Sequence, residues 1–362
     1  MGTRGDAIRV GAAVAAVLGL FVQPAAPAER SPELAQLIKA ANEEGHLELT
    51  WGCALLGCTA GAQAYEKTMN ELYGTNISLR YTPGTTSPQV ASQIIETHRA
   101  NKPAPTDAFL DTTDWTAYAA LENDHALRKV DWVKLMPDRI LPKMVESNGE
   151  MVRVFTQRPG GISYNTQLAP MKPTKLTDLL LPVWKGKLAS TPYAAGFDML
   201  SDVWGPDKAI DFATKLSAQL GGLMRCGEDQ RIISGEFLAF AMDCAGITWQ
   251  PYAAKGAPIT LISPSDFSAV QYYYMAIPVN SAHPNAAELF TVFLLTPEGQ
   301  KVMWDVFSLD LSNFPDSQMY RKYLEESEKK GVKPNEFTVT WVSEHPEYGK
   351  TQAQIVKILT QH

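Results

Sequence analysis

Short apolar segments alternate with amphipathic segments through the first third of the chain, and this alternation constrains the fold most. Residues 46–51, 76–81 and 108–111 are apolar and strand-like. Between them, apolar residues recur at helical spacing, and Ser31 and Ser87 each precede a proline that can open a helix. Strands that alternate with helices are typical of an α/β fold around a mainly parallel sheet. We therefore predict an α/β protein.

Each predicted strand is followed by a loop rich in Gly, Ser or Thr, at residues 52–59, 83–87 and 112–114. Parallel strands end at one edge of a sheet, and ligands bind in the crevice beyond that edge, where helix N-termini present backbone N–H groups. The same residue types also make ordinary turns and helix caps. Three such loops in succession favour a ligand cleft. The candidate contacts from these loops are Cys53, Ala54, Thr85, Thr86, Ser87, Thr112 and Thr113.

The N-terminus has the three-part pattern of a secretory signal peptide. Arg4 and Arg9 precede the apolar run Val10–Val22, and small residues and prolines follow. A membrane-spanning helix needs about 20 apolar residues, so this run is too short. An uncleaved membrane anchor is the alternative. We expect residues 1–28 to be a cleaved signal peptide and the mature protein, from about Glu29, to be periplasmic.

Removal of the signal peptide would leave 334 of the 362 residues, which suggests two domains at about 150 residues each. The net charge of the chain is −7, and it has no basic runs. Nucleic-acid binding is not expected, because phosphate neutralisation requires clustered Lys and Arg. The hydrophobic content of 45% argues against disorder.

Four cysteines remain in the expected mature protein: Cys53, Cys58, Cys226 and Cys244. An even number of cysteines in an exported protein indicates disulfides. Of the three possible pairings we favour Cys53 with Cys58 and Cys226 with Cys244, because each closes a short loop within one expected lobe. A zinc site is the alternative, but the spacing lacks the close ligand pairs of structural zinc sites.

Common catalytic signatures are missing from the sequence. It contains no Gly-x-Ser-x-Gly, no His-Glu-x-x-His and no Gly-x4-Gly-Lys-Ser/Thr motif. The adjacent acids Glu228 and Asp229 are expected to be solvated rather than to form an acid/base pair. We therefore predict a binding protein with no catalytic residues, no cofactor and no metal site. A secreted hydrolase is the less favoured alternative.

Two groups of short motifs stand out in the second half of the chain. The first consists of Gly161–Thr166 (GISYNT), Leu176–Leu180 (LTDLL) and Pro182–Leu188 (PVWKGKL). The second consists of His283–Phe290 (HPNAAELF) and Thr296–Gln300 (TPEGQ). These stretches resemble the extracellular solute-binding proteins of ABC transporters, in the group typified by ferric-iron, thiamine and polyamine-binding proteins. The motifs are structural, so they point to the scaffold more than to the solute.

The resemblance covers roughly residues 45–305 and implies a type II periplasmic-binding fold, in which two α/β lobes close over a ligand. We expect the first lobe to comprise 29–153 with 264–312, and the second 154–263 with 313–362. Closure lets an importer distinguish loaded from empty protein, because a ligand that touches both lobes stabilises the closed state. The implied partners are a small-molecule solute and an ABC permease in the inner membrane, with the protein itself a monomer. The alternative is a solute sensor that acts on a membrane receptor kinase.

Ferric iron is the alternative ligand within the same family. Members that bind iron generally supply adjacent tyrosines just before the chain returns to the first lobe, because Fe(III) favours phenolate and carboxylate oxygen. Here residues 247–252 (ITWQPY) lack that pair. The later run Tyr272-Tyr273-Tyr274 lies in a predicted strand, where only Tyr272 and Tyr274 share a side, and core packing is the favoured role.

His283 belongs to a helix start rather than to a metal site. Asn285 and Glu288 have the spacing of a capping box, so we expect a helix to begin there. His283 would then cap the helix or lie on the surface.

An organic solute that is anionic or aromatic fits the remaining residues better than iron. Tyr193 and Trp249 could stack on its apolar part, while hydroxyls and backbone N–H groups hold a carboxylate or phosphate. The guanidinium of Arg158 or Arg225 could hold a carboxylate through two hydrogen bonds, although either arginine could instead be a solvated surface charge. The candidate contacts beyond the first three loops are Arg158, Tyr193, Gly196, Phe197, Asp198, Arg225, Trp249, Gln250 and Tyr272.

Overall fold

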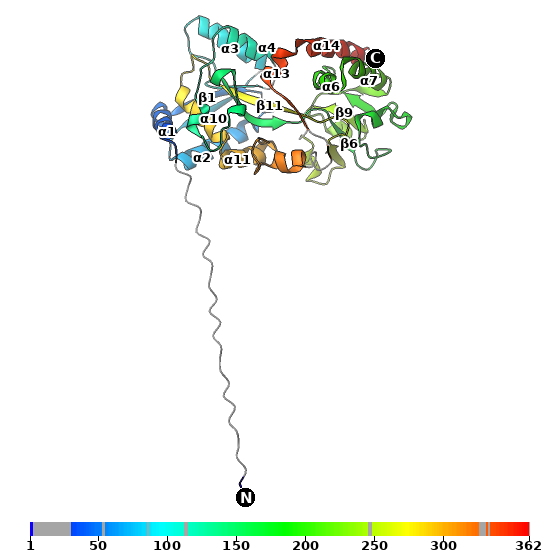
Figure 1. Cartoon of the computed structure of the whole chain (residues 1–362), viewed down its shortest axis with the longest axis horizontal. Helices are drawn as coiled ribbons and strands as arrows, with labels where there is room; N and C mark the ends of the chain where they lie inside the picture. Colours follow the sequence, from blue (N-terminus) through cyan, green and yellow to red (C-terminus); the bar gives the residue numbers. More distant parts are fainter. Residues whose placement is uncertain are drawn as a thin grey trace. The chain divides into compact units, whose positions relative to one another are not determined.

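The described part of the chain forms two lobes, each with a large hydrophobic core: the first holds a two-stranded and a five-stranded sheet, and the second holds another five-stranded sheet (Figure 1). The computed structural model describes residues 1–2, 30–52, 55–84, 87–111, 115–244, 248–325, 331 and 334–361, with the backbone alone at 115, 116, 323 and 324. Residues 31–362 form one compact unit. Apart from Met1 and Gly2, the expected signal peptide lies outside the described residues. Among described helices, none combines the length and apolarity needed to cross a membrane.

Helices and strands alternate in the first lobe as predicted. Their order is α1 (Pro32–Glu44), β1 (His46–Trp51), α2 (Cys58–Tyr73), β2 (Ser78–Pro83), α3 (Ser87–Arg99), β3 (Phe109–Asp111), α4 (Trp115–Asn123), α5 (Trp132–Leu135), β4 (Val145–Glu146) and β5 (Met151–Gln157). Ser31 caps α1 as expected, because its hydroxyl accepts the backbone N–H of Leu34 at 3.1 Å. Gly45 ends the same helix in the left-handed region, at φ 67°.

The second lobe follows directly after β5 and is also built from helices and strands. Its elements are β6 (Gly161–Asn165), β7 (Leu188–Ser190), α6 (Phe197–Trp204), α7 (Pro206–Ser217), β8 (Leu220–Leu223), α8 (Gln230–Ile233), β9 (Ala239–Asp243), α9 (Gln250–Ala253) and β10 (Ile259–Ile262). Two motifs that carried the family resemblance, in residues 176–180 and 182–184, form 3₁₀ turns. The buried indole of Trp184 anchors the second turn in the core of this lobe.

The chain then returns to the first lobe and ends on the second. The returning elements are β11 (Ala269–Ala276), α10 (Pro284–Leu294), α11 (Pro297–Phe307), a π-helical turn (Tyr320–Leu324), β12 (Asn335–Phe337), α13 (Val339–Glu344) and α14 (Pro346–Thr360). β12 pairs with β11 in the first lobe, whereas Ile355 and Leu359 of α14 are buried in the second core. The lobes are therefore joined at residues 158–160, at 263–268 and around β12. The lobe boundaries given above stay a prediction.

Three parallel strands of the first lobe end at one sheet edge. β1 and β2 are parallel, with Trp51 opposite Pro83. A parallel bridge between Leu49 and Ala108 places β3 beside β1 in the same direction. The three strands that precede the loops predicted to bind ligand therefore end at a common edge.

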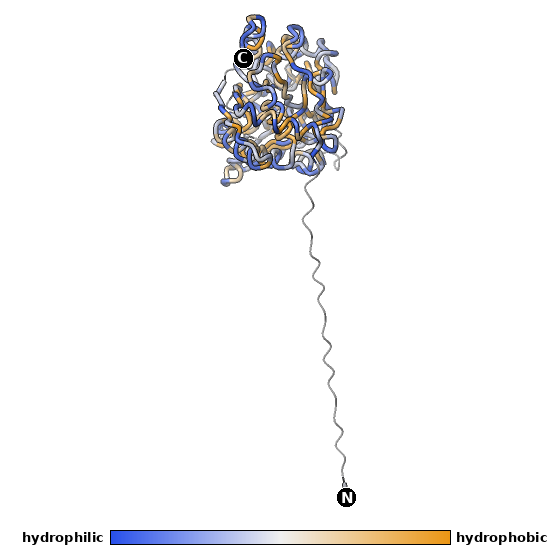
Figure 2. Tube along the Cα trace, turned by 90° about the vertical axis from the view of Figure 1, so that its left-hand side faces the viewer, coloured by the Kyte–Doolittle hydropathy of each residue, from blue (hydrophilic) through white to orange (hydrophobic). Residues whose placement is uncertain are grey.

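The sheet of the second lobe has the strand order β10-β6-β9-β7-β8. β7 is parallel to both of its neighbours, β9 and β8, so these three strands also end at one edge. Helices α6, α7 and α14 pack together over this sheet and bury Phe197 and Phe212 (Figure 1). Seen from the side of the first lobe, hydrophobic segments run through the interior and hydrophilic segments dominate the outline (Figure 2).

The predicted capping box at Asn285 and Glu288 is wrong. The helix begins after His283 without a side-chain cap from its own turn. Instead, the carboxylate of Glu44 at the end of α1 accepts the N–H of Ala286 at 2.8 Å and the Asn285 amide at 2.6 Å. Glu288 faces Arg128, at 2.6 Å. Because α1 packs against α10, a partner distant in sequence replaced the local one.

Candidate functional site

Three loops of the second lobe leave the sheet where its parallel strands end. Residues 191–196 follow β7, residues 224–229 follow β8, and residues 244–249 follow β9. Each loop leads into a helix, α6, α8 or α9. Loops of this kind are where open α/β sheets receive their ligands.

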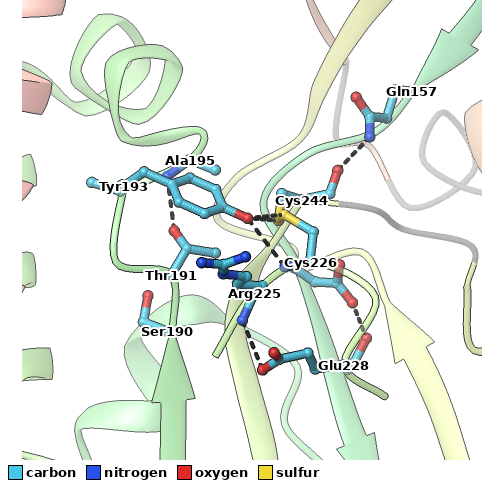
Figure 3. Close-up of a disulfide and its surroundings, with 12 residues drawn as sticks. Gln157, Ser190, Thr191, Tyr193, Ala195, Arg225, Cys226, Glu228 and Cys244 are labelled. Atoms are coloured by element: carbon cyan, nitrogen blue, oxygen red, sulfur yellow. Dashed lines mark hydrogen bonds between the residues drawn. A yellow bond between two sulfur atoms is a disulfide. The ribbon is translucent and has the colours of Figure 1, made fainter. Parts of the chain in front are cut away.

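A disulfide between Cys226 and Cys244 joins two of these loops (Figure 3). Their Cα atoms lie 5.8 Å apart, and the predicted pairing is confirmed. Since β7 lies between β8 and β9, the bridge spans the loop that follows β7. Cys58 is also disulfide-bonded, while Cys53, its predicted partner, lies outside the described residues.

The phenol of Tyr193 reaches across to this disulfide (Figure 3). Its hydroxyl oxygen lies 2.7 Å from the Sγ of Cys226 and 3.1 Å from the backbone nitrogen of the same residue. A disulfide sulfur carries no hydrogen, so the hydroxyl donates to the sulfur and accepts the N–H. Nevertheless Tyr193 is 43% exposed. The hydroxyl is thus engaged within the protein, and the ring is the part offered to solvent.

Several contacts hold the backbone of the Tyr193 loop. The hydroxyl of Thr191 accepts the N–H of Ala195 at 3.0 Å. From α14, the amide of Gln352 donates to the carbonyl oxygen of Ala194 at 3.1 Å. Gly196 has φ 77°, and a Cβ built there would lie 3.3 Å from the Cε of Met242. The loop is therefore braced by its own turn and by the C-terminal helix.

Arg225 supplies an exposed cation to the same loop cluster. Its backbone N–H donates to Glu228 Oε2 at 3.0 Å, which fixes the turn after β8. The guanidinium extends from this turn on the side of the disulfide where Tyr193 lies (Figure 3). Glu228 itself is held by Arg231, at 3.2 Å.

Asp229 does not follow the expectation of a solvated acid. It is 2% exposed and precedes α8 without capping it through its side chain. Burial raises the pKa of Asp229 to about 6, opposed by a hydrogen bond from Thr248 and reinforced by the charge of Asp243. The sequence does not reveal this burial, because two consecutive side chains such as Glu228 and Asp229 can point in different directions.

Trp249 and Gln250 lie where the third loop enters α9. Both are partly exposed, and Trp249 packs on the edge of a small cluster that contains Met224 and Phe240. Asp198 is partly exposed at the start of α6, and burial raises its pKa against the lowering effect of two backbone N–H groups. The structure thus brings Tyr193, Gly196, Asp198, Arg225, Trp249 and Gln250 to one sheet edge.

Three other predicted contacts lie elsewhere. Phe197 is fully buried and stacks on Phe212 in the core. Arg158 is 7% exposed and lines a small pocket between two of the connections that join the lobes, where its Nη2 donates to the Ser268 hydroxyl at 2.8 Å. Tyr272 is 1% exposed beneath the Arg153 guanidinium, 4.0 Å from the ring centroid. In this structure none of the three presents its side chain at the loop cluster.

Of the candidate contacts in the first lobe, Ser87 alone lies within the described residues. Cys53, Ala54, Thr85, Thr86, Thr112 and Thr113 lie outside the described residues. Ser87 is partly exposed at the first position of α3. These positions stay predictions.

The sequence gives no indication of two hydrogen bonds beside the candidate site. The amide of Gln157, at the end of β5, donates to the carbonyl oxygen of Cys244 at 2.6 Å. The side-chain oxygen of Gln157 accepts a hydrogen bond from Gln271 on β11. Isolated glutamines in predicted strands give no sequence signal, since the pairing depends on the register of β5 and β11.

In the ranges that the structure describes, no group of three or more His, Cys, Asp or Glu side chains is arranged to hold a metal ion. Tyr272 and Tyr274, the tyrosines that share one side of β11, are both buried, and burial raises the pKa of each phenol. His283 contacts Asp107, with Nδ1 2.9 Å from Oδ2.

Sequence comparisons and structure comparisons differ in outcome. Neither a scan against protein-family models nor a search of curated proteins gave a match. Iron-bound HitA from Pseudomonas aeruginosa has a similar structure, with a TM-score of 0.65 at 19% identity over 86% of this chain and 99% of HitA. The substrate-binding protein of an ABC transporter from Agrobacterium tumefaciens gives 0.67 at 12% identity, over 88% and 96%. The periplasmic binding protein AfuA from Actinobacillus pleuropneumoniae, with fructose-6-phosphate bound, gives 0.59 at 18%, over 86% and 97%.

Identities this low establish a shared fold and leave the ligand open. The two lobes, each with strands that end at a common edge, agree with that fold. The chain has the type II periplasmic-binding fold, which it shares with HitA, with AfuA and with the substrate-binding protein of an ABC transporter.

Proposed function

We propose that this protein is the solute-binding component of an ABC importer. It captures a small organic anion with a flat or aromatic part in the periplasm, as a monomer, and delivers it to a permease in the inner membrane. Capture requires no chemistry and no cofactor. Closure of the two lobes around the connecting segments would report the loaded state to the permease, because the ligand contributes free energy to the closed form alone.

The observation that carries the ligand class is the ring of Tyr193. The ring is 43% exposed, and its hydroxyl is already bonded to Cys226. What remains for a ligand is the ring face, which favours a planar or apolar group by stacking. Trp249, partly exposed on the third loop, offers a second aromatic surface.

The charge of the ligand is argued from Arg225. Its guanidinium is exposed at the same sheet edge and extends on the side where Tyr193 lies (Figure 3). A guanidinium can hold a carboxylate through two parallel hydrogen bonds. The backbone N–H groups at the start of α6 add a favourable environment for the same anion. The first-lobe residues Thr85, Thr86, Ser87, Thr112 and Thr113 are proposed to complete the site on closure.

Ferric iron is the second candidate, favoured by the likeness to iron-bound HitA. The local geometry opposes it. To bind iron, the Tyr193 oxygen would have to leave both the sulfur and the N–H of Cys226. A sensor role with a membrane receptor kinase would use the same closure, and a hydrolase would release product rather than unchanged ligand.

Thermal-shift screening of the ligand-stripped mature protein tests the proposal. The panel contains benzoate, phthalate, fructose 6-phosphate, 4-aminobutyrate, spermidine and ferric citrate. A ligand at 100 times its dissociation constant adds about 2.7 kcal/mol to the free energy of unfolding, which raises the melting temperature measurably. We expect a shift with the aromatic carboxylates, and recovery of the ligand unchanged. A shift with ferric citrate alone would overturn the ligand class.

A further inference from the structure

We propose that the Cys226–Cys244 disulfide is a positioning element of the solute site, which holds the ring of Tyr193 in the orientation that a ligand contacts. The inference rests on the proposed function, because it concerns the same loop cluster. It assigns to the disulfide a role in affinity beyond joining two loops.

The contacts of Tyr193 divide into two groups. Thr191 and Gln352 hold the backbone of its loop. The side chain, by contrast, is directed by its hydroxyl, which bonds to the sulfur and the N–H of Cys226 at 2.7 and 3.1 Å. Because the ring is 43% exposed, packing constrains it less than a buried ring, and these polar contacts set its direction.

The disulfide in turn fixes the position of Cys226. Without the bridge, Cys226 would be held by its own turn 224–229 alone, in which Arg225 and Gly227 are exposed. Cys244 directly follows β9, and its carbonyl oxygen accepts the amide of Gln157 at 2.6 Å. The bridge therefore ties Cys226 to the end of a central strand, and through Cys226 it fixes the phenol.

The effect of a fixed Tyr193 ring on ligand affinity can be estimated. A side chain that is already immobile loses less conformational freedom when a ligand binds. Release of the Tyr193 ring is expected to weaken binding about 2- to 12-fold, which corresponds to the ordering of one side chain.

The experiment compares Cys226→Ser/Cys244→Ser, Tyr193→Phe and the triple variant with the wild type. Serine variants are preferred to a reducing agent, which would also open the disulfide at Cys58. Benzoate affinity is measured by calorimetry, and urea unfolding reports the stability of each variant. Tyr348→Phe is the matched control, because Tyr348 is a partly exposed tyrosine of the second lobe that bonds to Asp202.

Ligand-free NMR of ring-labelled tyrosine provides a second readout, with the Tyr193 signal assigned by its loss in Tyr193→Phe. We expect the Tyr193 signal to shift or broaden in the disulfide variant. Benzoate should bind about 2- to 12-fold more weakly to both the disulfide variant and Tyr193→Phe, and the triple variant should be no weaker than either. Tyr348→Phe should bind as the wild type does.

Two results would overturn the inference. One is an unchanged Tyr193 signal in the disulfide variant. The other is weaker binding by the disulfide variant with wild-type binding by Tyr193→Phe, since the bridge would then act through another group. If the wild type itself does not bind benzoate, the proposed ligand class fails, and the Tyr193 signal alone decides the positioning role.

Discussion

The side-chain amide of Gln157 donates a hydrogen bond of 2.6 Å to the carbonyl oxygen of Cys244. Gln157 ends the strand that leads out of the first lobe, and Cys244 begins a loop of the candidate site. The oxygen of the same glutamine accepts a bond from Gln271, on the strand that returns to the first lobe. The disulfide, the hydroxyl of Tyr193 and both connecting strands are therefore linked, so a movement between the lobes must also move the disulfide loop or break this bond.

Gln157→Leu is predicted to lower both stability and ligand affinity. The substitution leaves the largely buried carbonyl oxygen of Cys244 without this donor, which costs about 1–2 kcal/mol in the free energy of unfolding. It also frees the loop that carries the disulfide. Urea unfolding and benzoate calorimetry on the same preparations measure the two effects.

Gln219→Leu is the matched control for this prediction. Its amide donates to the carbonyl oxygen of Leu180 at 3.1 Å, within the second lobe and away from the connecting strands. A similar loss of stability is expected, with affinity unchanged. Equal losses of affinity in the two variants would show that Gln157 acts through general stability and not through the site.

Asp229→Asn is predicted to stabilise the protein at neutral pH. Because burial raises the pKa of Asp229 to about 6, the folded state binds this proton more tightly than the unfolded state does. Stability contributed by this group therefore falls as pH rises from about 4 to 6, by about 2–3 kcal/mol in total. The asparagine variant should lose that dependence, and no cap is sacrificed because the Asp229 side chain does not cap α8.

Urea unfolding between pH 4 and pH 7.5 measures this effect. Asp211→Asn serves as the control, since Asp211 is exposed in an i,i+4 pair with Lys215. It should change stability by less than about 0.5 kcal/mol at any pH in this range. A wild-type profile that rises with pH, and an Asp229→Asn profile that follows it, would contradict the raised pKa.

The sequence predicted the first lobe well because its signals are local. Ser31 before a proline, Gly45 after the helix and the alternation of strands need no distant partner, and all three match the structure. The short loops closed by Cys226 and Cys244 likewise favoured the correct pairing. Within the alternating tyrosines of β11, the prediction that Tyr272 and Tyr274 share a side also holds, since both face the Arg153 and Glu146 pair.

The candidate site was harder to predict because its parts are joined by register and by distant partners. Nothing near Tyr193 in sequence indicates that its hydroxyl would reach Cys226, 33 residues later. The capping of α10 by Glu44 shows the same limit, because the local candidate Glu288 was diverted to Arg128. The partners of polar residues are hard to predict from sequence, because several different groups can satisfy the hydrogen bonds of each one.

Arg153→Met is predicted to be strongly destabilising. The guanidinium is 5% exposed and contacts Glu146 at 3.2 Å and Glu336 at 3.4 Å above the ring of Tyr272. Removing the cation leaves the buried carboxylate of Glu146 without its counter-charge, at a cost of about 3–5 kcal/mol. The hydroxyls of Tyr274 and Thr340 still donate to that carboxylate, which favours the lower end of this range.

Chemical denaturation of four variants, namely Arg153→Met, Glu146→Gln, the double variant and Lys215→Met, tests the assignment. Arg153→Met/Glu146→Gln should recover part of the loss, because the uncompensated charge is gone. Lys215→Met, in an exposed pair, should cost less than about 0.5 kcal/mol. If the double variant were as unstable as the sum of its single substitutions, the two groups would not act as a pair.

Gly160→Ala is predicted to destabilise the protein through the first connection between the lobes. Gly160 has φ 86°, a region that costs an alanine about 1–2 kcal/mol, and its Cβ would overlap the ring of Phe267 from the second connection. Overpacking of this kind adds about 1–3 kcal/mol. The connections pack directly on each other here, so the clash also biases the angle between the lobes.

Gly186→Ala separates the backbone cost of a positive φ from the cost of the clash with Phe267. Gly186 has a similar φ of 75°, but no atom lies within 4 Å of its Cβ position. It should therefore show the backbone cost alone, near 1–2 kcal/mol, with unchanged small-angle X-ray scattering. Gly160→Ala should cost more in urea unfolding and should change the radius of gyration of the ligand-free protein. If the two variants lost equal stability and scattered alike, the contact between Gly160 and Phe267 would have no part in setting the lobe angle.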